Sequence, residues 1–380
     1  MIKQEINELK RLYTPSNCSI TRICGCYVDG EKNKKTEFKE AFLSLPEEEI
    51  FKYFELLRKT LSGSLGKNLL NLDFPLASEQ EGGTQAALLA LRDSKLKDDA
   101  LIEEFYDRVI NTYEYVGNYL ILLIHDAYDV PGKTTDGLTM DDASDTVFEY
   151  IMCCICPVNL SKPGLSYDNI NNEFHNRIRD WVVEMPETGF LFPSFNDRAT
   201  DIHSTLFYSK NPEEAHSEFV ENILGCTLPL SAGTQKEAFQ ALIEETLGDE
   251  VEYEVVKNIH ENLTEMIEEH KEIPEPLTLD KHQVKSLFEK SGVKEEKLTD
   301  FDKLYDAAAG EDTSLFVNNV ANVRTFEVKT PDVVVKVNPE RADLVNTLQI
   351  DGKRCLVIEI NDHVEVNGIT IHQGVSLEDV

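Results

Sequence analysis

The segment from Phe174 to Tyr208 has the richest mixture of side chains that could bind a ligand or catalyse a reaction. Histidines, arginines, aspartates, asparagines and the single tryptophan of the chain stand there among aromatic, proline and glycine residues. Buried polar groups need hydrogen-bond or charge partners, because unpaired ones destabilise a fold. The segment is therefore either a functional surface or a polar network within the fold. Its candidate ligand- or partner-binding residues are His175, Arg177, Arg179, Asp180, Trp181, Asn196, Asp197, Arg198, Asp201 and His203.

The arginines of this segment allow two interpretations. Arg177 and Arg179 alternate with apolar residues as on a strand, so they would project from one face and could hold a phosphate or a carboxylate. The polar residues 196–203 follow a predicted turn and could complete a pocket. Alternatively, the arginines pair with the aspartates of the same segment in a structural network. We assign no catalytic residue, because no nucleophile with a neighbouring base is identifiable.

A group of lysines lies on a predicted hairpin tip. Lys32, Lys34, Lys35 and Lys39 follow Asp29-Gly30 and are interleaved with glutamates at positions 31, 37 and 40. Such a group is typical of a solvated turn, and the other interpretation is a weak contact with phosphate.

The cysteines do not form a convincing metal site. Cys153 and Cys156 have the two intervening residues that zinc ligands favour, whereas Cys24 and Cys26 do not. Both segments are predicted strands, so we expect thiols in a hydrophobic core. Pro131–Thr135 is similar to the end of a phosphate-binding loop, but Ala127 occupies the position of its first glycine. We therefore expect neither a metal nor a cofactor.

Composition restricts the class of protein. The chain has 380 residues, of which 41% are hydrophobic, and a formal net charge of −33. This size allows two or three domains, and this charge repels phosphate backbones at long range. Nucleic-acid contact would require a local basic patch or a protein partner. The apolar runs are too short to span a bilayer, the N-terminal residues are no export signal, and eight cysteines suit a reducing cytoplasm.

The order of predicted elements indicates an α+β fold in three parts. Residues 1–225 predict a mixed antiparallel sheet with helices, in which 116–128 pairs with 146–158. Residues 226–310 predict an acidic helical module, and residues 311–380 a small antiparallel β-meander.

Individual elements are predicted from local signals. We expect strands at 19–28 and 36–43 and helices at 98–112, 235–247, 250–270 and 280–290. Ser44 and Asn211 each stand where a helix could begin. Asp351-Gly352 and Asn367-Gly368 predict hairpin turns, because glycine adopts the positive φ that type I′ requires.

Two resemblances extend these expectations. Through TRICGCYVDGEKNKK, CPVNLSKPGLSY and FHNRIRDWVVEMP the whole chain resembles an uncharacterised domain-of-unknown-function family of Gram-positive anaerobes. The order of elements, with Phe219-Val-Glu-Asn-Ile-Leu-Gly-Cys226, more distantly resembles the bacterial nucleoid-associated protein family. That resemblance implies an acidic protein at nucleoid DNA and no catalytic residues.

The sequence therefore favours a cytoplasmic binding or accessory protein, at the nucleoid, with DNA or a DNA-associated protein as its partner and no membrane. The alternative is a hydrolase or transferase acting on a phosphorylated small molecule at 174–208. A deep pocket that contains Arg177, Arg179 and His203 would favour the enzyme, and a flat or convex surface would favour a macromolecular partner.

Overall fold

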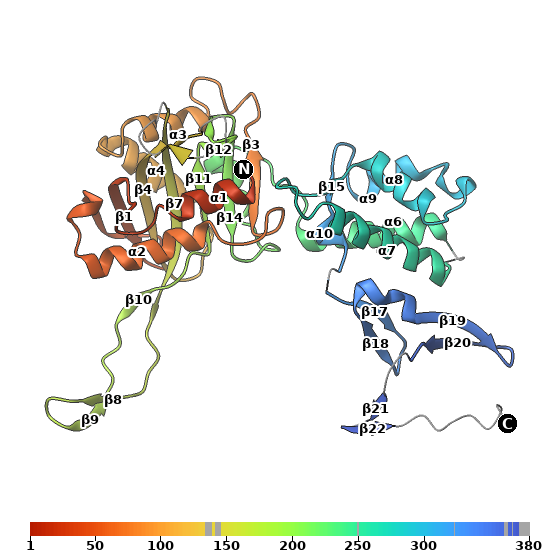
Figure 1. Ribbon diagram of the computed structural model, residues 1–380. Coiled ribbons are helices and arrows are strands. Elements are labelled where there is room, and N and C mark those ends of the chain that lie inside the picture. Colours follow the sequence, from red (N-terminus) through yellow and green to blue (C-terminus); the bar gives the residue numbers. More distant parts are fainter. Residues whose placement is uncertain are drawn as a thin grey trace. The chain divides into compact units, whose positions relative to one another are not determined.

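The computed structural model describes residues 1–133, 139–140, 146–248, 251–322, 324–360, 364–366 and 368–371. The chain forms two compact units (Figure 1). Unit 1 is Met1–Gly233 with Pro274–Pro276, and unit 2 is Thr234–Ile273 with Leu277–Val380. Helices and antiparallel strands are both abundant, which confirms the α+β class. The division into three parts near residues 225 and 310 stays a prediction.

Unit 1 contains a large antiparallel sheet. Its strands follow one another in the order β2 (Lys34–Glu40), β1 (Ile20–Val28), β4 (Asn118–Val130), β7 (Thr146–Leu160), β11 (Thr188–Phe192), β14 (Ser204–Ser209) and β3 (Leu69–Asp73), and β10 (Trp181–Val183) also pairs with β7. The predicted pairing of the two long apolar segments is confirmed, since Asn118 lies opposite Val158 and Val130 opposite Thr146.

Both faces of this sheet are buried, which explains why its central strands are almost wholly apolar. Alternate residues of a strand point to opposite faces. On β7, Tyr150 and Met152 belong to one hydrophobic core, and Ile151 and Cys153 belong to the other. Each fully buried apolar side chain stabilises the fold by roughly 1.5–3 kcal/mol.

Helices cover the two faces (Figure 1). The first core is closed by α1 (Lys3–Lys10) and α2 (Glu47–Thr60) through buried residues such as Leu9 and Phe54. The second is closed by α3 (Thr84–Asp93), α4 (Asp99–Thr112), the short α5 (Ser217–Phe219) and the π-helical turn η2 (Val220–Leu224). Unit 1 is thus a helix–sheet–helix arrangement.

Two predicted helix starts in unit 1 are wrong. Ser44 is the last residue of a 3₁₀ turn, η1 (Phe42–Ser44), and its hydroxyl donates to the Ala41 carbonyl, so α2 begins after Pro46. Asn211 lies in the loop after β14, and the next helix, α5, begins only at Ser217. By contrast, the helix expected at 98–112 corresponds to α4. The Asp98 carboxylate caps it and accepts from the backbone N–H groups of Ala100 and Leu101.

Three smaller hairpins project from the sheet of unit 1. They are β5 (Gly132–Lys133) with β6 (Thr139–Met140), β8 (Leu165–Asp168) with β9 (Glu173–Asn176), and β12 (Ser194–Asn196) with β13 (Ala199–Asp201). The second is the tip of a long excursion of the chain from β7 to β10, which Figure 1 shows extending away from the sheet. We call residues 159–183 the β-arm.

Unit 2 combines helices with small hairpins. Its helices are α6 (Ala232–Leu247), α7 (Tyr253–Glu269), α8 (Lys281–Lys290), η3 (Glu295–Leu298), α9 (Phe301–Ala308), α10 (Val317–Val320) and η4 (Pro339–Leu344). Its strand pairs are β15 (Thr278–Leu279) with β16 (Leu315–Phe316), β17 (Phe326–Lys329) with β18 (Val334–Val337), β19 (Val345–Ile350) with β20 (Lys353–Ile358), and β21 (Val364–Val366) with β22 (Ile369–Ile371).

The predicted helices and turns of unit 2 agree with this structure where it can be compared. The expected helices at 235–247, 250–270 and 280–290 correspond to α6, α7 and α8, although Glu250 lies outside the described residues. Asp351 and Gly352 have φ values of 53° and 75° between β19 and β20, as a type I′ turn requires. Asn367 lies outside the described residues.

Candidate functional site

The predicted site residues divide between two places in unit 1. His175, Arg177, Arg179, Asp180 and Trp181 lie on the β-arm, which leaves the sheet where β10 pairs with residues 158–160 of β7. The residues from Asn196 to His203 follow β11, whose Phe192 lies opposite Ile151 towards the other end of β7. The structure therefore does not bring the two groups into one pocket.

The β-arm exposes both apolar and basic side chains. Ile170, Phe174 and Ile178 are 87%, 71% and 79% exposed, and Trp181 is 55% exposed. Arg177 is also exposed. The rings of the neighbouring strands β8 and β9 contact each other, with a Tyr167–Phe174 centroid distance of 5.3 Å. Such an exposed row of large apolar residues is typical of a contact surface.

Hydrogen bonds between Ser161 and the residues Arg179 and Asp180 hold the base of the arm. The Arg179 Nε donates to the carbonyl of Ser161 at 2.6 Å, and the Asp180 N–H donates to the Ser161 hydroxyl at 3.2 Å. His175 Nδ1 lies 2.9 Å from the carbonyl of Asn176. The Arg179 guanidinium therefore positions the arm, whereas the Arg177 side chain extends into solvent.

The second group forms a structural network. Asp201 accepts hydrogen bonds from the Asn196 amide at 2.6 Å, from the Ser204 hydroxyl at 2.8 Å and from the His203 N–H at 3.0 Å. The His203 ring lies 2.7 Å from Glu79, which raises the pKa of His203. These bonds fix the β12–β13 hairpin.

Arg198 pairs outside the predicted segment. Its guanidinium lies 2.9 Å from the Glu8 carboxylate and donates to the carbonyl of Pro131 at 3.1 Å. The expected partners, the aspartates at 197 and 201, are not its ion-pair partners. Asp197 and Arg198 have φ values of 51° and 57°, so both belong to the tight turn of the hairpin.

The hairpin lysines that could contact phosphate are occupied by carboxylates. Lys32 lies 2.7 Å from Glu114, and Lys35 lies 2.7 Å from Asp29. The Lys34 ammonium pairs with both Glu103 and Asp107, and Lys39 pairs with Asp99 at 2.9 Å. Each lysine charge is thus neutralised within unit 1, which agrees with the interpretation of a solvated turn.

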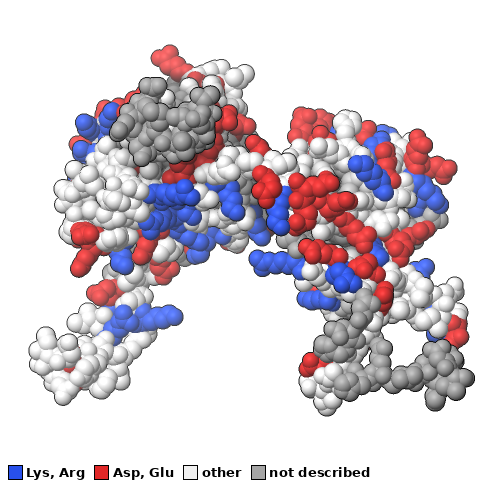
Figure 2. Space-filling view, in the orientation of Figure 1, with Lys and Arg blue, Asp and Glu red and all other residues white. Residues whose placement is uncertain are grey.

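A different group of basic residues gathers where α1 and α2 end. Lys10 and Arg11 close α1, and Arg58 and Lys59 lie in the last turn of α2. We call these four residues the α1–α2 basic surface. Figure 2 shows basic side chains gathered over α1 and α2. In the described part of the chain none of the four forms an ion pair.

The contacts within this surface leave its charges uncompensated. The Lys10 Nζ donates to the Ser62 hydroxyl at 2.8 Å, and the Arg58 guanidinium donates to the carbonyl of Tyr13. Burial, with the nearby positive charges of Arg58 and Lys59, lowers the pKa of Lys10. Four cations without carboxylate partners can bind an external anion such as a phosphate. Their places at helix C-termini are also favourable by themselves, because cations there interact with the negative end of the helix dipole.

Sequence reasoning did not find this surface. The two pairs of basic residues are separated by 46 positions between Arg11 and Arg58, and neither pair is unusual alone. The sequence shows only basic residues at the ends of two amphipathic helices. Their meeting follows from the packing of α1 and α2 on one face of the sheet.

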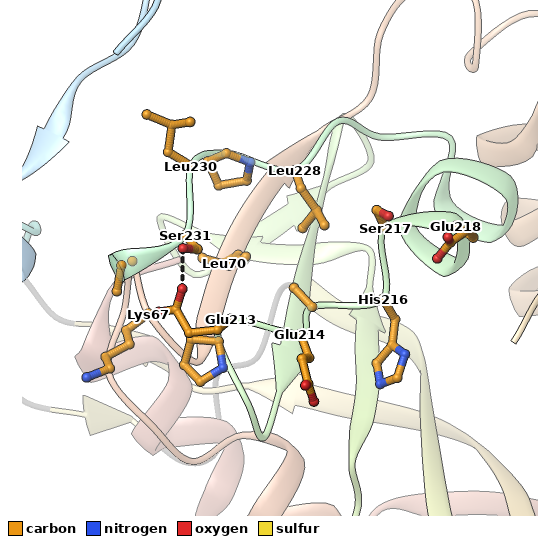
Figure 3. A pocket seen from close by; sticks show the side chains of 15 residues that line it. Lys67, Leu70, Glu213, Glu214, His216, Ser217, Glu218, Leu228, Leu230 and Ser231 are labelled. Atoms are coloured by element: carbon orange, nitrogen blue, oxygen red, sulfur yellow. Dashed lines mark hydrogen bonds between the residues drawn. The ribbon is translucent and has the colours of Figure 1, made fainter. Parts of the chain in front are cut away.

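Unit 1 also has a small pocket of about 310 Å³ beside the loop after β14 (Figure 3). Its charged lining residues are Lys67, Glu213, Glu214 and Glu218, with His216 between them in the chain. Glu213 accepts from the Ser231 hydroxyl at 2.5 Å and from the Gly233 N–H at 2.9 Å. Three carboxylates against one ammonium make this pocket unfavourable for a phosphate.

The cysteines of the sheet lie in its cores. Cys24, Cys26 and Cys153 belong to the core under α4, and Cys154 and Cys156 to the core under α2, all as free thiols. Cys153 and Cys156 thus face opposite sides of β7 and cannot share a metal. Within the described residues, no group of three or more His, Cys, Asp or Glu side chains is placed to hold a metal ion.

The comparisons with known proteins give a family but no activity. Among the described residues, no helix is both long and apolar enough to cross a membrane. No curated protein matches the sequence. The family model described as "Domain of unknown function (DUF4317)" matches residues 1–369. The chain therefore belongs to this domain-of-unknown-function family, DUF4317.

Proposed function

We propose that this chain is a cytoplasmic DNA-binding accessory protein of the nucleoid that contacts the phosphate backbone through the α1–α2 basic surface. The observation that carries the proposal is the convergence of Lys10, Arg11, Arg58 and Lys59 without carboxylate partners in the described residues. In a chain of net charge −33, cations without carboxylate partners form the part of the surface that repels a phosphate backbone least.

Phosphate contact is the chemistry that fits such a surface best. Lysine and arginine side chains at phosphates release counterions, which provides most of the affinity of sequence-independent DNA binding. Unlike the hairpin lysines, these cations need not break an ion pair within the protein before they meet a phosphate.

The β-arm provides a second contact on unit 1. Thr60, at the end of α2, packs against Gly189 near the start of β11, where a Cβ would lie 2.8 Å from its methyl group. The base of the arm, at Val183, is six positions before Gly189. Gly189 lies opposite Cys154 and Val183 lies opposite Val158, so the end of α2 contacts the sheet four residues along β7 from the base of the arm.

The composition of the arm suits an approach to DNA. Its basic residues Lys162, Arg177 and Arg179 balance its acidic residues Asp168, Glu173 and Asp180, so the arm has no net charge, unlike the chain as a whole. Exposed apolar and aromatic side chains can wedge between base steps or stack on bases. Phe174 and Trp181 are 71% and 55% exposed, and this exposure supports them as the residues of this contact.

The alternative function, a hydrolase or transferase acting on a phosphorylated small molecule, has no support. It requires Arg177, Arg179 and His203 in one deep pocket. The two arginines lie on the β-arm, and His203 follows the β12–β13 hairpin and pairs with Glu79.

A matched pair of variants tests the proposal. Arg11→Gln/Lys59→Gln removes two unpaired cations, and Lys32→Gln/Lys35→Gln removes two cations that are held by Glu114 and Asp29. The net charge changes equally in both. We expect the first variant to bind a 30-base-pair duplex about tenfold more weakly at low salt, because two phosphate contacts are lost, and the second to bind like the wild type within about twofold. Fluorescence anisotropy measures both.

Three results would contradict the proposal: no binding of the wild type, equal weakening in the two variants, or no weakening in either. Circular dichroism melting of both variants is the control for folding. The side chains of Arg11 and Lys59 are chosen because no hydrogen bond from them is present in the described structure.

A further inference from the structure

Unit 2 contains a larger cavity of about 620 Å³. It is lined by residues of α6 and α7 and by residues of β17, η4 and β20. Cavities of this size hold small organic ligands. A DNA duplex does not enter a space of this volume, so the cavity requires a separate explanation.

Cations predominate in its lining. The lining contains four cationic side chains, Lys236, Lys257, Lys329 and Arg354, and two carboxylates, Glu261 and Glu327. Glu327 pairs with Lys336, which lies outside the lining, at 2.9 Å.

The remaining cations of the lining have weak internal compensation. In the part of unit 2 that the structure describes, Lys236, Lys329 and Arg354 form no ion pair. The cavity is therefore electropositive within a strongly acidic chain.

Lys257 is the residue that most requires an anion. It is 7% exposed, its Nζ donates to the Asn346 side-chain oxygen at 3.0 Å, and the nearest Glu261 oxygen lies 3.9 Å away. A buried ammonium needs close partners, because its transfer from water is costly. The Asn346 oxygen accepts from one of the three N–H groups of the Lys257 ammonium. The ammonium can therefore still donate to an anionic oxygen.

The lining of the cavity also contains apolar and aromatic side chains. Phe239, Ile243, Tyr253 and Phe326 line it. His260 packs edge-on against Phe326 with a ring distance of 6.2 Å, and burial lowers its pKa, so the ring is neutral near pH 7. A neutral imidazole can both donate and accept a hydrogen bond.

We propose that this cavity binds a small organic anion, with a phosphomonoester or carboxylate group at Lys257, Lys329 and Arg354 and an aromatic body against Phe239 and Phe326. Arginine recognises both anionic groups with paired hydrogen bonds. The proposal does not depend on DNA binding by unit 1.

Isothermal titration of the full chain with two probes tests it, one for each anionic group. Adenosine monophosphate represents the phosphomonoesters, and 2-naphthoate represents the carboxylates. We expect at least one to bind at a single site per chain, with a dissociation constant below about 1 mM. Binding of one probe alone identifies the anionic group. If neither probe binds in this range, the proposal is overturned.

Variants locate the binding. Lys329→Gln/Arg354→Gln removes two cations of the lining, and the control Lys281→Gln/Lys285→Gln removes two lysines of unit 2 that pair with Asp306 and Asp302 outside it. We expect a weakening of at least about tenfold in the first and less than twofold in the second. Unchanged affinity in the first variant, or equal loss in both, would overturn the assignment. Lys329 and Arg354 are exposed, so their replacement preserves the fold.

Discussion

The Ser62 side chain links Lys10 to the backbone of Arg58, although Lys10 and Arg58 are 48 positions apart in the sequence. The Lys10 ammonium donates to the Ser62 hydroxyl at 2.8 Å, and this hydroxyl donates to the Arg58 carbonyl at 2.5 Å. The end of α1 is thereby fixed beside the end of α2. The Lys10 ammonium donates to a neutral hydroxyl and the Arg58 guanidinium to the carbonyl of Tyr13, so neither cation has a carboxylate partner. This arrangement is the physical basis of the proposed phosphate contact.

The three arginines of segment 174–208 should differ in how much they contribute to the stability of unit 1. Arg177 and Arg179 are exposed, so Arg177→Gln/Arg179→Gln should change the melting temperature little while weakening DNA binding. Arg198→Gln removes the partly buried bonds to Glu8 and Pro131 and should cost on the order of 1–3 kcal/mol. Urea denaturation compares the variants. A larger loss from the double variant would place the arm arginines in a structural network.

His125 should make the stability of unit 1 fall in mild acid. It is fully buried, its Nδ1 lies 2.7 Å from the Thr21 hydroxyl, and burial lowers its pKa from 6.5 to about 4. The folded state therefore binds fewer protons than the unfolded state between these values. Stability from this group is complete above pH 6.5 and decreases as the pH falls towards 4.

The His125→Asn variant isolates this effect, because an amide can retain the bond to Thr21 but does not titrate. Between pH 7.5 and pH 4.5 the wild type should lose about 2–3 kcal/mol more than the variant, at ~1.4 kcal/mol per pKa unit. Denaturant titrations at the two pH values give the difference. Parallel losses in the two proteins would mean that His125 titrates normally in the fold.

The free thiols should react according to their burial. Cys355 and Cys18 are partly exposed, and burial raises the pKa of Cys18 to about 11, so Cys355 should react first with Ellman's reagent and Cys18 slowly. The thiols that should react only in denaturant are Cys24, Cys26, Cys153, Cys154, Cys156 and Cys226. In Cys355→Ser the fast phase should disappear. Stoichiometric zinc in elemental analysis would contradict the assignment of core thiols.

Local patterns in the sequence were sufficient for much of the fold. The two apolar segments 116–128 and 146–158 predicted the central pair β4 and β7, because strands buried on both faces must be continuously apolar. The helix at 98–112 and the turn at Asp351-Gly352 were also predicted, because both depend on residues close in the sequence. The start of α2 was misplaced because Ser44 satisfies a turn before the helix.

The candidate site depends on contacts between distant parts of the chain, which a single sequence does not specify. The composition of 174–208 predicted one cluster, yet strand pairing sends its two halves to different ends of β7. Arg198 finds Glu8, 190 residues away, and Lys10 meets Arg58 only because α1 and α2 share a core. Which charges are paired, and which remain available, is decided by tertiary packing.

The salt dependence of DNA binding reports how many phosphates the protein contacts. The logarithm of the association constant decreases with the logarithm of salt concentration by ~0.9 for each phosphate neutralised in duplex DNA. We expect Arg11→Gln/Lys59→Gln to reduce this slope by about 2 and Lys32→Gln/Lys35→Gln to leave the wild-type slope unchanged. Identical slopes in all three proteins would contradict phosphate contact at the α1–α2 basic surface.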